Sequence, residues 1–142
     1  MQEMQPATFV GTWKLNLAKS KTEGWTPRSQ TQVYEDWGGG LGHALFEGTD
    51  AQGKPMLVMY VARYDGKAYP FLIRGATVAC TMSLTPMEPV DGRTVAFRVL
   101  ADGRPSLTGT TQIAADGKSL AIIYKTNNMG EPSSAVLVYD KQ

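Results

Sequence analysis

Few side chains in this 142-residue chain could carry out chemistry, and they stand apart from one another. His43 is the single histidine and Cys80 the single cysteine. A histidine near neutral pH could act as a general base or as a polar anchor for a ligand. No nucleophile or second acid stands at a recognisable spacing from His43. The sequence therefore favours an ordinary structural or exposed histidine, and leaves His43 as the one catalytic candidate.

The sequence contains no recognisable motif for binding a metal ion or a cofactor. One cysteine and one histidine cannot supply a zinc site, and a lone aspartate in each turn cannot supply the oxygen ligands of calcium. No phosphate-binding loop or nucleophile elbow occurs. Cys80 has no basic neighbour, so it is expected to be an inert buried thiol. We expect no metal and no cofactor, and the balance favours a protein that is not an enzyme.

Three arginines stand within or beside apolar segments. Arg98 alternates with Phe97, so its side chain is expected to face solvent. Arg63 lies in a segment that is apolar on both faces, and a buried Arg63 would need an anionic partner such as a ligand. Arg74 is expected at a strand end, where it could guard the mouth of a barrel. A solvated or surface-paired side chain is the simpler expectation for all three.

Large apolar and aromatic side chains recur at strand spacing along the chain. A small barrel needs such side chains either to fill its interior or to line a cavity, and methionines fill irregular space. The candidate ligand-binding residues are Trp13, His43, Tyr60, Phe71, Met82, Phe97, Tyr124 and Tyr139. For Trp13 the first expectation is structural: the indole closes the barrel base against the last strands, beneath a basic side chain.

The segment from Phe9 to Leu17 alternates cleanly and predicts the first strand. Phe9, Gly11, Trp13, Leu15 and Leu17 share one face, and polar residues dominate the other. Gly11 leaves a gap two residues before the indole, where another group could approach closely. Residues 18–28 are too short and too broken for a pair of helices, and are expected to form a long loop with at most one helical turn. Trp25 could cover a barrel end from this loop.

Alternation and turn signals predict a series of strands. These cover residues 9–17, 28–37, 41–49, 56–64, 68–73, 77–85, 94–101, 105–114, 119–126 and 133–140. Four Asp-Gly-basic triplets, beginning at Asp65, Asp91, Asp102 and Asp116, supply the positive φ angles of tight turns between antiparallel neighbours. Pro70 interrupts the segment 68–73 and indicates an edge or a bend.

Strands joined in order by short turns favour closure. We predict an all-β fold: a single antiparallel up-and-down β-barrel of about 8–10 strands, lipocalin-like, spanning residues 1–142. A β-sandwich is the alternative, but sandwiches favour Greek-key crossings that hairpins in series do not supply. The segment Met56 to Tyr64 is apolar on both faces, so its outer face is expected to be covered by a loop or by a second copy of the chain.

Composition excludes several classes of partner. The net charge of +1 gives no footprint for nucleic acid, and no apolar run is long enough to insert in a membrane. Residues 1–8 form a polar lead-in, expected to be flexible, without the basic and apolar regions of a signal peptide. This favours a secreted or periplasmic protein whose signal was removed, with a cytoplasmic protein as the alternative.

The two ends of the chain resemble the calycin superfamily, which contains the lipocalins and the fatty-acid-binding proteins. Gly11-Thr12-Trp13 matches the Gly-X-Trp motif of their first strand, and 136–141 is similar to the last strand of a fatty-acid-binding protein. That family implies an Arg two residues before Tyr139, where this chain has Leu137, and a helix pair for which there is no room. A bacterial lipocalin-like barrel is the closer description.

Three functions fit such a barrel. The first is a carrier that holds a small apolar or amphipathic ligand in its cavity. The second is a cyclase or isomerase in which His43 or a lumen tyrosine moves a proton. The third is a filled barrel that acts through its outer face, for example as a homodimer.

Overall fold

The computed structural model of the protein describes residues 4–23, 26–75, 82–126 and 134–142. Two short 3-10 helices, η1 (Ala7–Phe9) and η2 (Leu17–Lys19), flank the first strand. The strands are β1 (Gly11–Leu15), β2 (Lys21–Glu23), β3 (Ser29–Asp36), β4 (Gly42–Thr49), β5 (Pro55–Ala62), β6 (Tyr69–Pro70), β7 (Leu72–Arg74), β8 (Met82–Pro86), β9 (Thr94–Ala101), β10 (Arg104–Ile113), β11 (Ser119–Thr126) and β12 (Ser134–Lys141). No helix in these ranges is long and apolar enough to cross a membrane.

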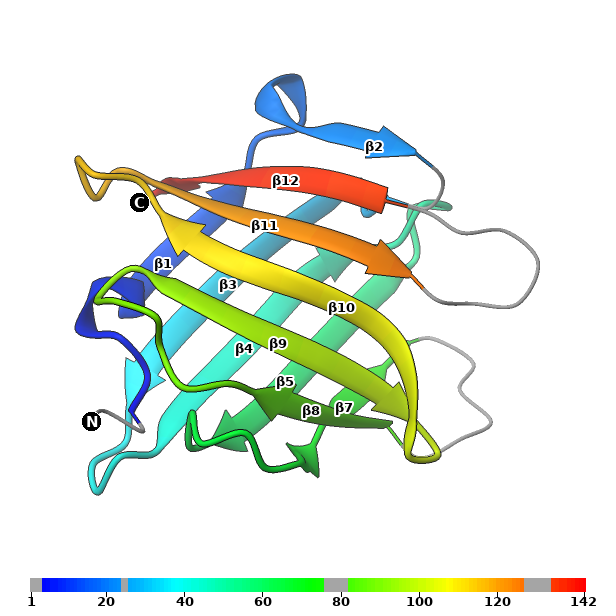
Figure 1. The fold of residues 1–142 in the computed structure, drawn as a ribbon. Helices are drawn as coiled ribbons and strands as arrows, with labels where there is room; N and C mark the ends of the chain where they lie inside the picture. The colour runs from blue at the N-terminus through cyan, green and yellow to red at the C-terminus, as the bar shows by residue number, and fades with distance from the viewer. Residues whose placement is uncertain (1–3, 24–25, 76–81, 127–133) are drawn as a thin grey trace.

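Antiparallel pairing joins the strands into one nearly closed barrel. The order is β6-β8-β9-β10-β11-β12-β1-β3-β4-β5-β7, and β2 pairs with the first part of β12. Figure 1 shows β9 to β12 crossing in front of β1, β3, β4 and β5, so that the two halves of the wall enclose the interior. The predicted all-β antiparallel barrel is confirmed.

The described strands number twelve, against the 8–10 that the sequence predicts. The difference comes from the short strands β2, β6 and β7. The expected strand over 68–73 divides at Phe71 into β6 and β7, which pair with β8 and β5 respectively. Pro70 ends β6 at this division, in agreement with the predicted bend. The turn at Asp65 therefore does not join hairpin neighbours, whereas the turn at Asp102 does.

The first strand is shorter than predicted. It begins at Gly11, because Phe9 lies in η1, and it ends at Leu15. Gly11 has a φ of +138°, and a Cβ placed there would lie 3.3 Å from Cε of Lys141. The predicted close approach at Gly11 is therefore made by a lysine side chain. The region 18–28 contains β2 as well as η2; Trp25 lies outside the described residues.

The part of the lead-in that the structure describes is packed rather than extended. Gln5 and Pro6 are buried, and the Phe9 side chain is fully enclosed. The Phe9 ring makes edge contacts with Tyr34 and Tyr64, at centroid distances of 5.7 and 6.4 Å. Apolar burial of Pro6 and Phe9 holds this part of the chain against one end of the barrel. The flexibility expected over residues 1–8 stays a prediction.

Candidate ligand-binding cavity

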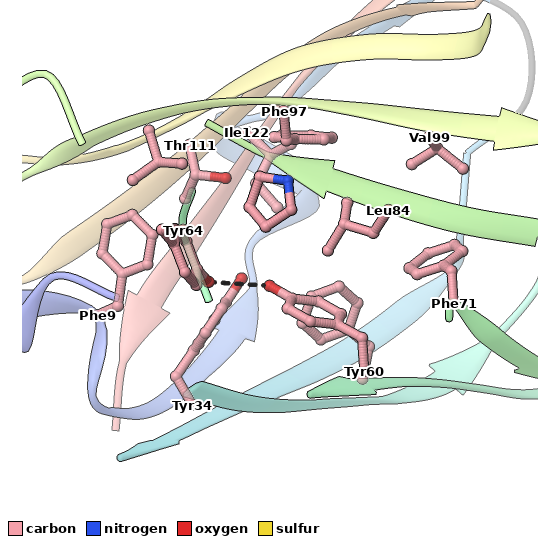
Figure 2. Close-up of a pocket in the computed structure, with 13 residues that line it drawn as sticks. Phe9, Tyr34, Tyr60, Tyr64, Phe71, Leu84, Phe97, Val99, Thr111 and Ile122 are labelled. Atoms are coloured by element: carbon pink, nitrogen blue, oxygen red, sulfur yellow. Dashed lines mark hydrogen bonds between the residues drawn. The ribbon is translucent and has the colours of Figure 1, made fainter. Parts of the chain in front are cut away.

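The barrel encloses a cavity with a wide part and a narrow inner part. The wide cavity has a volume of about 360 Å³ and reaches the strand ends at Pro27, Met56 and Ile73. The inner cavity has a volume of about 60 Å³ and ends against Phe9 and Tyr64. Both parts are lined by Phe46, Phe71, Phe97, Val99 and Ile122, so they adjoin. Figure 2 shows the inner cavity, with aromatic rings facing one another across it.

Six of the eight residues predicted to bind a ligand line this cavity. Tyr60 lines the inner part, and Phe71 and Phe97 line both parts. The wide part is also lined by Met82, Tyr124 and Tyr139. Strands β5, β8, β9, β11 and β12 supply five of these side chains by alternation, and Phe71 projects from the break between β6 and β7.

Trp13 has the structural position that was expected first. Its side chain is fully buried and lies outside the cavity lining. The indole Nε1 donates to the Phe9 carbonyl oxygen at 2.9 Å, and Nζ of Lys141 lies 5.4 Å from the ring centroid. The indole therefore connects η1 to the last strand beneath a cation, which accounts for its burial without a ligand.

His43 does not point into the cavity, so it is wrong as a ligand-binding candidate, and its position is that of the structural histidine that the sequence favoured. Ala44 and Phe46 occupy the inner face of β4, so His43 lies on the outer face. Its ring stacks on Trp37 at a centroid distance of 4.4 Å, and Nδ1 lies 3.0 Å from Oε1 of Glu35. The low exposure of His43 results from this surface cluster. A proton-transfer role for His43 on a ligand inside the barrel is excluded by its position.

A polar strip follows one wall of the cavity, from the wide part at Gln30, Gln32 and Tyr139 to the inner part at Tyr34. Gln30 Oε1 accepts hydrogen bonds from Tyr139 Oη at 2.6 Å and from Gln32 Nε2 at 2.8 Å. Gln32 Oε1 in turn accepts from Tyr34 Oη at 2.7 Å. These four residues, which we name the glutamine strip, come from the inner faces of β3 and β12. The strip places hydrogen-bonding groups in an otherwise apolar lining.

A second chain of polar contacts runs from Tyr60 to the end of the barrel that η1 covers. Tyr60 Oη and Tyr64 Oη lie 3.3 Å apart, and Tyr64 Oη donates to Gln5 Oε1 at 3.3 Å. The first of these contacts is the dashed line in Figure 2. Burial raises the pKa of Tyr60 to about 12 and raises the pKa values of Tyr34, Tyr64 and Tyr139 as well. The lumen tyrosines hold their protons near neutral pH and are hydrogen-bond donors rather than bases.

Charged side chains lie on the outside of the barrel. None of the described residues that line either part of the cavity is Asp, Glu, Lys, Arg or His. Arg74 and Arg98 are exposed, as is Arg63, which donates to the Gly39 carbonyl oxygen. Arg63 therefore needs no anionic ligand to compensate burial, and it does not line the cavity. Over the described ranges, no group of three His, Cys, Asp or Glu side chains could hold a metal ion; Cys80 lies outside these ranges.

Sequence reasoning missed the two glutamines of the strip, Gln30 and Gln32, and two inner tyrosines, Tyr34 and Tyr64. The signal was present for β3, because Gln30, Gln32 and Tyr34 share one face. That face reads as polar, however, and Val33 on the opposite face made the outer side look equally buried. Polarity alone could not show that this strand turns its glutamines inward.

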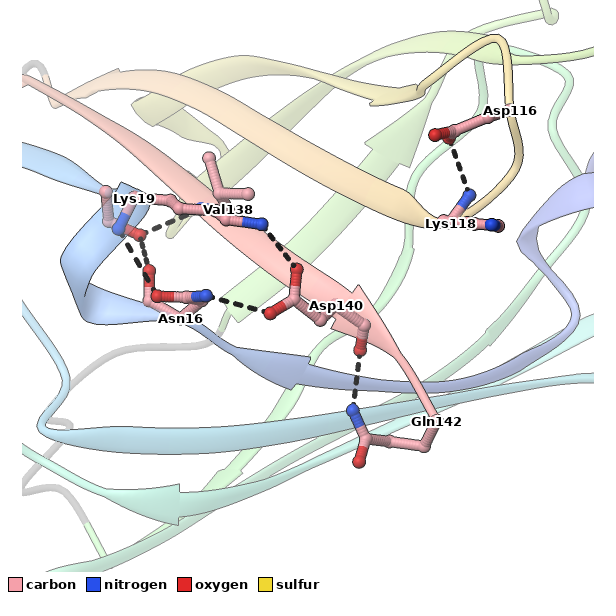
Figure 3. A network of polar contacts seen from close by, with 8 residues as sticks. Asn16, Lys19, Asp116, Lys118, Val138, Asp140 and Gln142 are labelled. Atoms are coloured by element: carbon pink, nitrogen blue, oxygen red, sulfur yellow. Dashed lines mark hydrogen bonds and ion pairs between the residues drawn. The ribbon is translucent and has the colours of Figure 1, made fainter.

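The bend between β1 and β2 is held by polar contacts to the last strand (Figure 3). Asn16 Nδ2 donates to Oδ2 of Asp140 at 2.8 Å, and Nζ of Lys19 lies 3.5 Å from Oδ1 of the same carboxylate. Ser20 Oγ donates to the Asn16 carbonyl oxygen and accepts from the Val138 amide. The Asn16 hydrogen bond and the Lys19 charge lower the pKa of Asp140. This cluster explains local structure and lies away from the cavity.

The outer face of β5 lies in an apolar row. Leu45 pairs with Met59 and Met59 with Leu72 across β4, β5 and β7, and Val33 of β3 continues the row. Met59 is half-buried by these neighbours, whereas Leu72 is 54% exposed. Cover by a second copy of the chain stays a prediction.

Comparison with known proteins identifies the fold. No protein-family model and no curated protein matches the sequence. Among solved structures, the wild-type fluorescent protein UnaG is similar over 94% of this chain and 97% of its own, with a TM-score of 0.61 and 14% identity. A mutant of UnaG gives a TM-score of 0.62 at 14% identity, over 95% of this chain and 96% of its own. The likeness shows that the two proteins share an antiparallel β-barrel fold over almost the whole chain.

Proposed function

We propose that this protein is a lipocalin-like carrier that holds a small apolar or amphipathic molecule inside its barrel. The observation that carries the proposal is the wide cavity of about 360 Å³, lined by aliphatic and aromatic side chains and by the glutamine strip. Small-molecule sites are concave and mostly apolar, with a few placed polar groups. Burial of the ligand's apolar surface would supply affinity, and the strip would supply orientation.

The geometry supports entry from one end. The opposite end is blocked by η1, where Phe9 packs against Tyr34 and Tyr64. The wide cavity instead reaches the ends of β5 and β7 at Met56 and Ile73. A bound molecule would therefore place its buried end toward Phe46 and Phe97, and its other end between the strand ends.

The test is uptake of N-phenyl-1-naphthylamine, a neutral apolar probe that fluoresces when it leaves water. We expect saturable binding at one site per chain, and a co-purifying small molecule in native mass spectra of protein from its own cells. The substitution Ile73→Trp fills the wide part of the cavity and should weaken probe binding at least 10-fold. Its matched control is Leu72→Trp, on the outer face one residue earlier, which should change the affinity less than 2-fold. An apo mass with no probe uptake would overturn the proposal.

A further inference from the structure

We infer that the cavity selects an uncharged ligand carrying a hydrogen-bond acceptor, such as a carbonyl oxygen, which the Gln30 side-chain amide binds. The inference rests on the proposed carrier function and specifies the chemical class of its ligand. The described lining has no charged group that could compensate a ligand charge. A carboxylate or an alkylammonium ion should therefore be excluded even when its hydrocarbon chain equals that of a neutral ligand.

The first observation is the electrostatic character of the wall. The described lining residues of both parts of the cavity are all uncharged, and the tyrosines among them are neutral at physiological pH. Leu137 lies beside Tyr139 on the inner face of β12 and is 5% exposed. A ligand charge placed here would lose its hydration without gaining a countercharge, and such a transfer is strongly unfavourable.

The second observation is the hydrogen-bond balance of the glutamine strip. Gln30 Oε1 already accepts two hydrogen bonds, from Tyr139 and from Gln32, so both of its lone pairs are used. Gln30 Nε2 donates to no group within the described part of the chain, and the residue lines the wide cavity. The strip therefore offers a ligand an N–H donor, and the group that complements it is an acceptor oxygen or nitrogen.

A third observation lies at the inner end of the cavity. Thr111 is 6% exposed, lines the inner cavity and makes no hydrogen bond through its hydroxyl to any described residue. Figure 2 shows this hydroxyl directed toward the interior. A neutral hydroxyl can donate or accept, so it also suits an uncharged polar group and does not compensate a full charge.

Charge exclusion has a definite pH signature. A fatty acid could enter only in its protonated form, so its apparent affinity should fall about 10-fold for each pH unit above the pKa of the free acid. The affinity of a primary amide should be independent of pH between 5.5 and 8, because neither the amide nor the described lining titrates there. Because the two ligands have the same hydrocarbon chain, the difference between their pH dependences isolates the contribution of the head group.

The experiment compares dodecanamide, dodecanoate and dodecylamine as competitors of N-phenyl-1-naphthylamine at pH 7.5. We expect dodecanamide to bind at least 10-fold more tightly than either charged compound. Equal or tighter binding of dodecanoate or dodecylamine would overturn the inference while leaving the carrier function intact. Binding of neither the probe nor any competitor would overturn both.

Variants locate the donor. Gln30→Leu should lower the preference for dodecanamide over the hydrocarbon-like probe about 5-fold, since one hydrogen bond to the amide is lost. Gln112→Leu is the matched control, because Gln112 lies on the outer face of β10 and should change neither affinity. An unchanged preference for dodecanamide in Gln30→Leu would remove Gln30 from the site. Gln30→Arg should reverse the order of the head groups and favour dodecanoate.

Discussion

Trp13 shows how one side chain can join three parts of this barrel. The indole lies on β1, donates to the Phe9 carbonyl oxygen of η1 and lies beneath Lys141 of β12. The indole is fully buried, so loss of its hydrogen bond would leave the Phe9 carbonyl oxygen without this partner. Trp13 is therefore a structural connection between η1, which covers one end of the barrel, and the last strand β12.

Substitution of Trp13 tests this connection. Trp13→Phe removes the N–H donor and part of the buried volume, so the free energy of unfolding should fall by about 2–3 kcal/mol. Trp37→Phe is the control, because Trp37 is 56% exposed, and it should cost about 0.5 kcal/mol or less. Urea unfolding followed by circular dichroism measures both. Equal losses in the two variants would contradict the role assigned to Trp13.

The buried tyrosines give the protein a stability limit in alkali. Burial raises the pKa of Tyr60 from 10.0 to about 12, so unfolding makes this phenol easier to ionise. The stabilisation is complete below pH 10 and is lost as pH rises from 10 to about 12; Tyr60 alone accounts for about 3 kcal/mol. Unfolding free energy measured by denaturant should fall steeply over that range. Tyr60→Phe should flatten the slope, and a slope equal to wild type would contradict the assignment.

The register of β4 decides which of its residues can meet a ligand. A shift of one residue in a strand exchanges its two faces. Ala44 pairs with Tyr34 and Tyr60 on the inner face, which places His43 between Glu35 and Val61 on the outer one. Because His43 lies on the outer face of β4, a carrier function is compatible with the register, and a function that uses His43 inside the barrel is not.

His43→Ala should leave the cavity unchanged. The substitution removes the stack on Trp37 and the contact to Glu35, both outside the barrel, so probe affinity should stay within 2-fold of wild type. Phe46→Ala, three residues along on the inner face, is the contrasting variant and should alter probe affinity because Phe46 lines both parts of the cavity. A 10-fold loss of probe binding in His43→Ala would show that the register is wrong.

The close pairing of β3 with β4 depends on a glycine, Gly48, which lies opposite Gln30. A Cβ at Gly48 would lie 2.0 Å from the Ser29 carbonyl oxygen and 2.7 Å from Cα of Gln30. Gly48→Ala should therefore push the strands apart and lower the unfolding free energy by about 3 kcal/mol, measured by urea titration. Gly92→Ala is the control, because nothing lies within 4 Å of the corresponding Cβ position. A neutral Gly48→Ala would contradict this close packing.

The elements that the sequence predicts well are those with an alternating pattern next to a turn triplet. Residues 94–101 and 119–126 match β9 and β11 at both ends, because apolar and polar residues alternate without ambiguity. Short strands and faces are predicted less well. β2 has no inward residue to mark it, and the segment around Phe71 divides because of partners distant in the sequence.

The sequence likewise predicts some residues of the candidate site and not others. Its large apolar members were predictable, because a barrel must place such residues somewhere inside. The glutamine strip was not, since the inward direction of Gln30 and Gln32 depends on pairing of β3 with β1 and β4. The pairing register of β4 with β3 and β5 was likewise needed to exclude His43 from the cavity lining. Residue type predicts burial, and only tertiary pairing predicts which buried face meets the cavity.

At the scale of the whole molecule, the barrel has a seam. The pairing path begins at β6 and ends at β7, and no strand ladder in the described residues joins these two edges. β5 and β6 lie in contact there, and Phe71 connects β6 to β7 while its side chain lines the cavity. The wall is therefore continuous through side chains at the seam and through backbone hydrogen bonds elsewhere.

Hydrogen exchange should reveal this seam as the least protected part of the wall. Amides in β6 and β7 have short ladders, so they should open at a low free-energy cost. They should exchange well before the amides of β10 and β11, which pair with a neighbour along seven or eight residues on each side. Exchange followed by mass spectrometry on wild-type protein measures the difference, with β10 and β11 as the internal control. Addition of saturating dodecanamide should slow exchange around Phe71, because a ligand in the cavity contacts that ring and stabilises the state in which the seam is closed. Uniform protection around the barrel would show that the seam is as firmly closed as the rest.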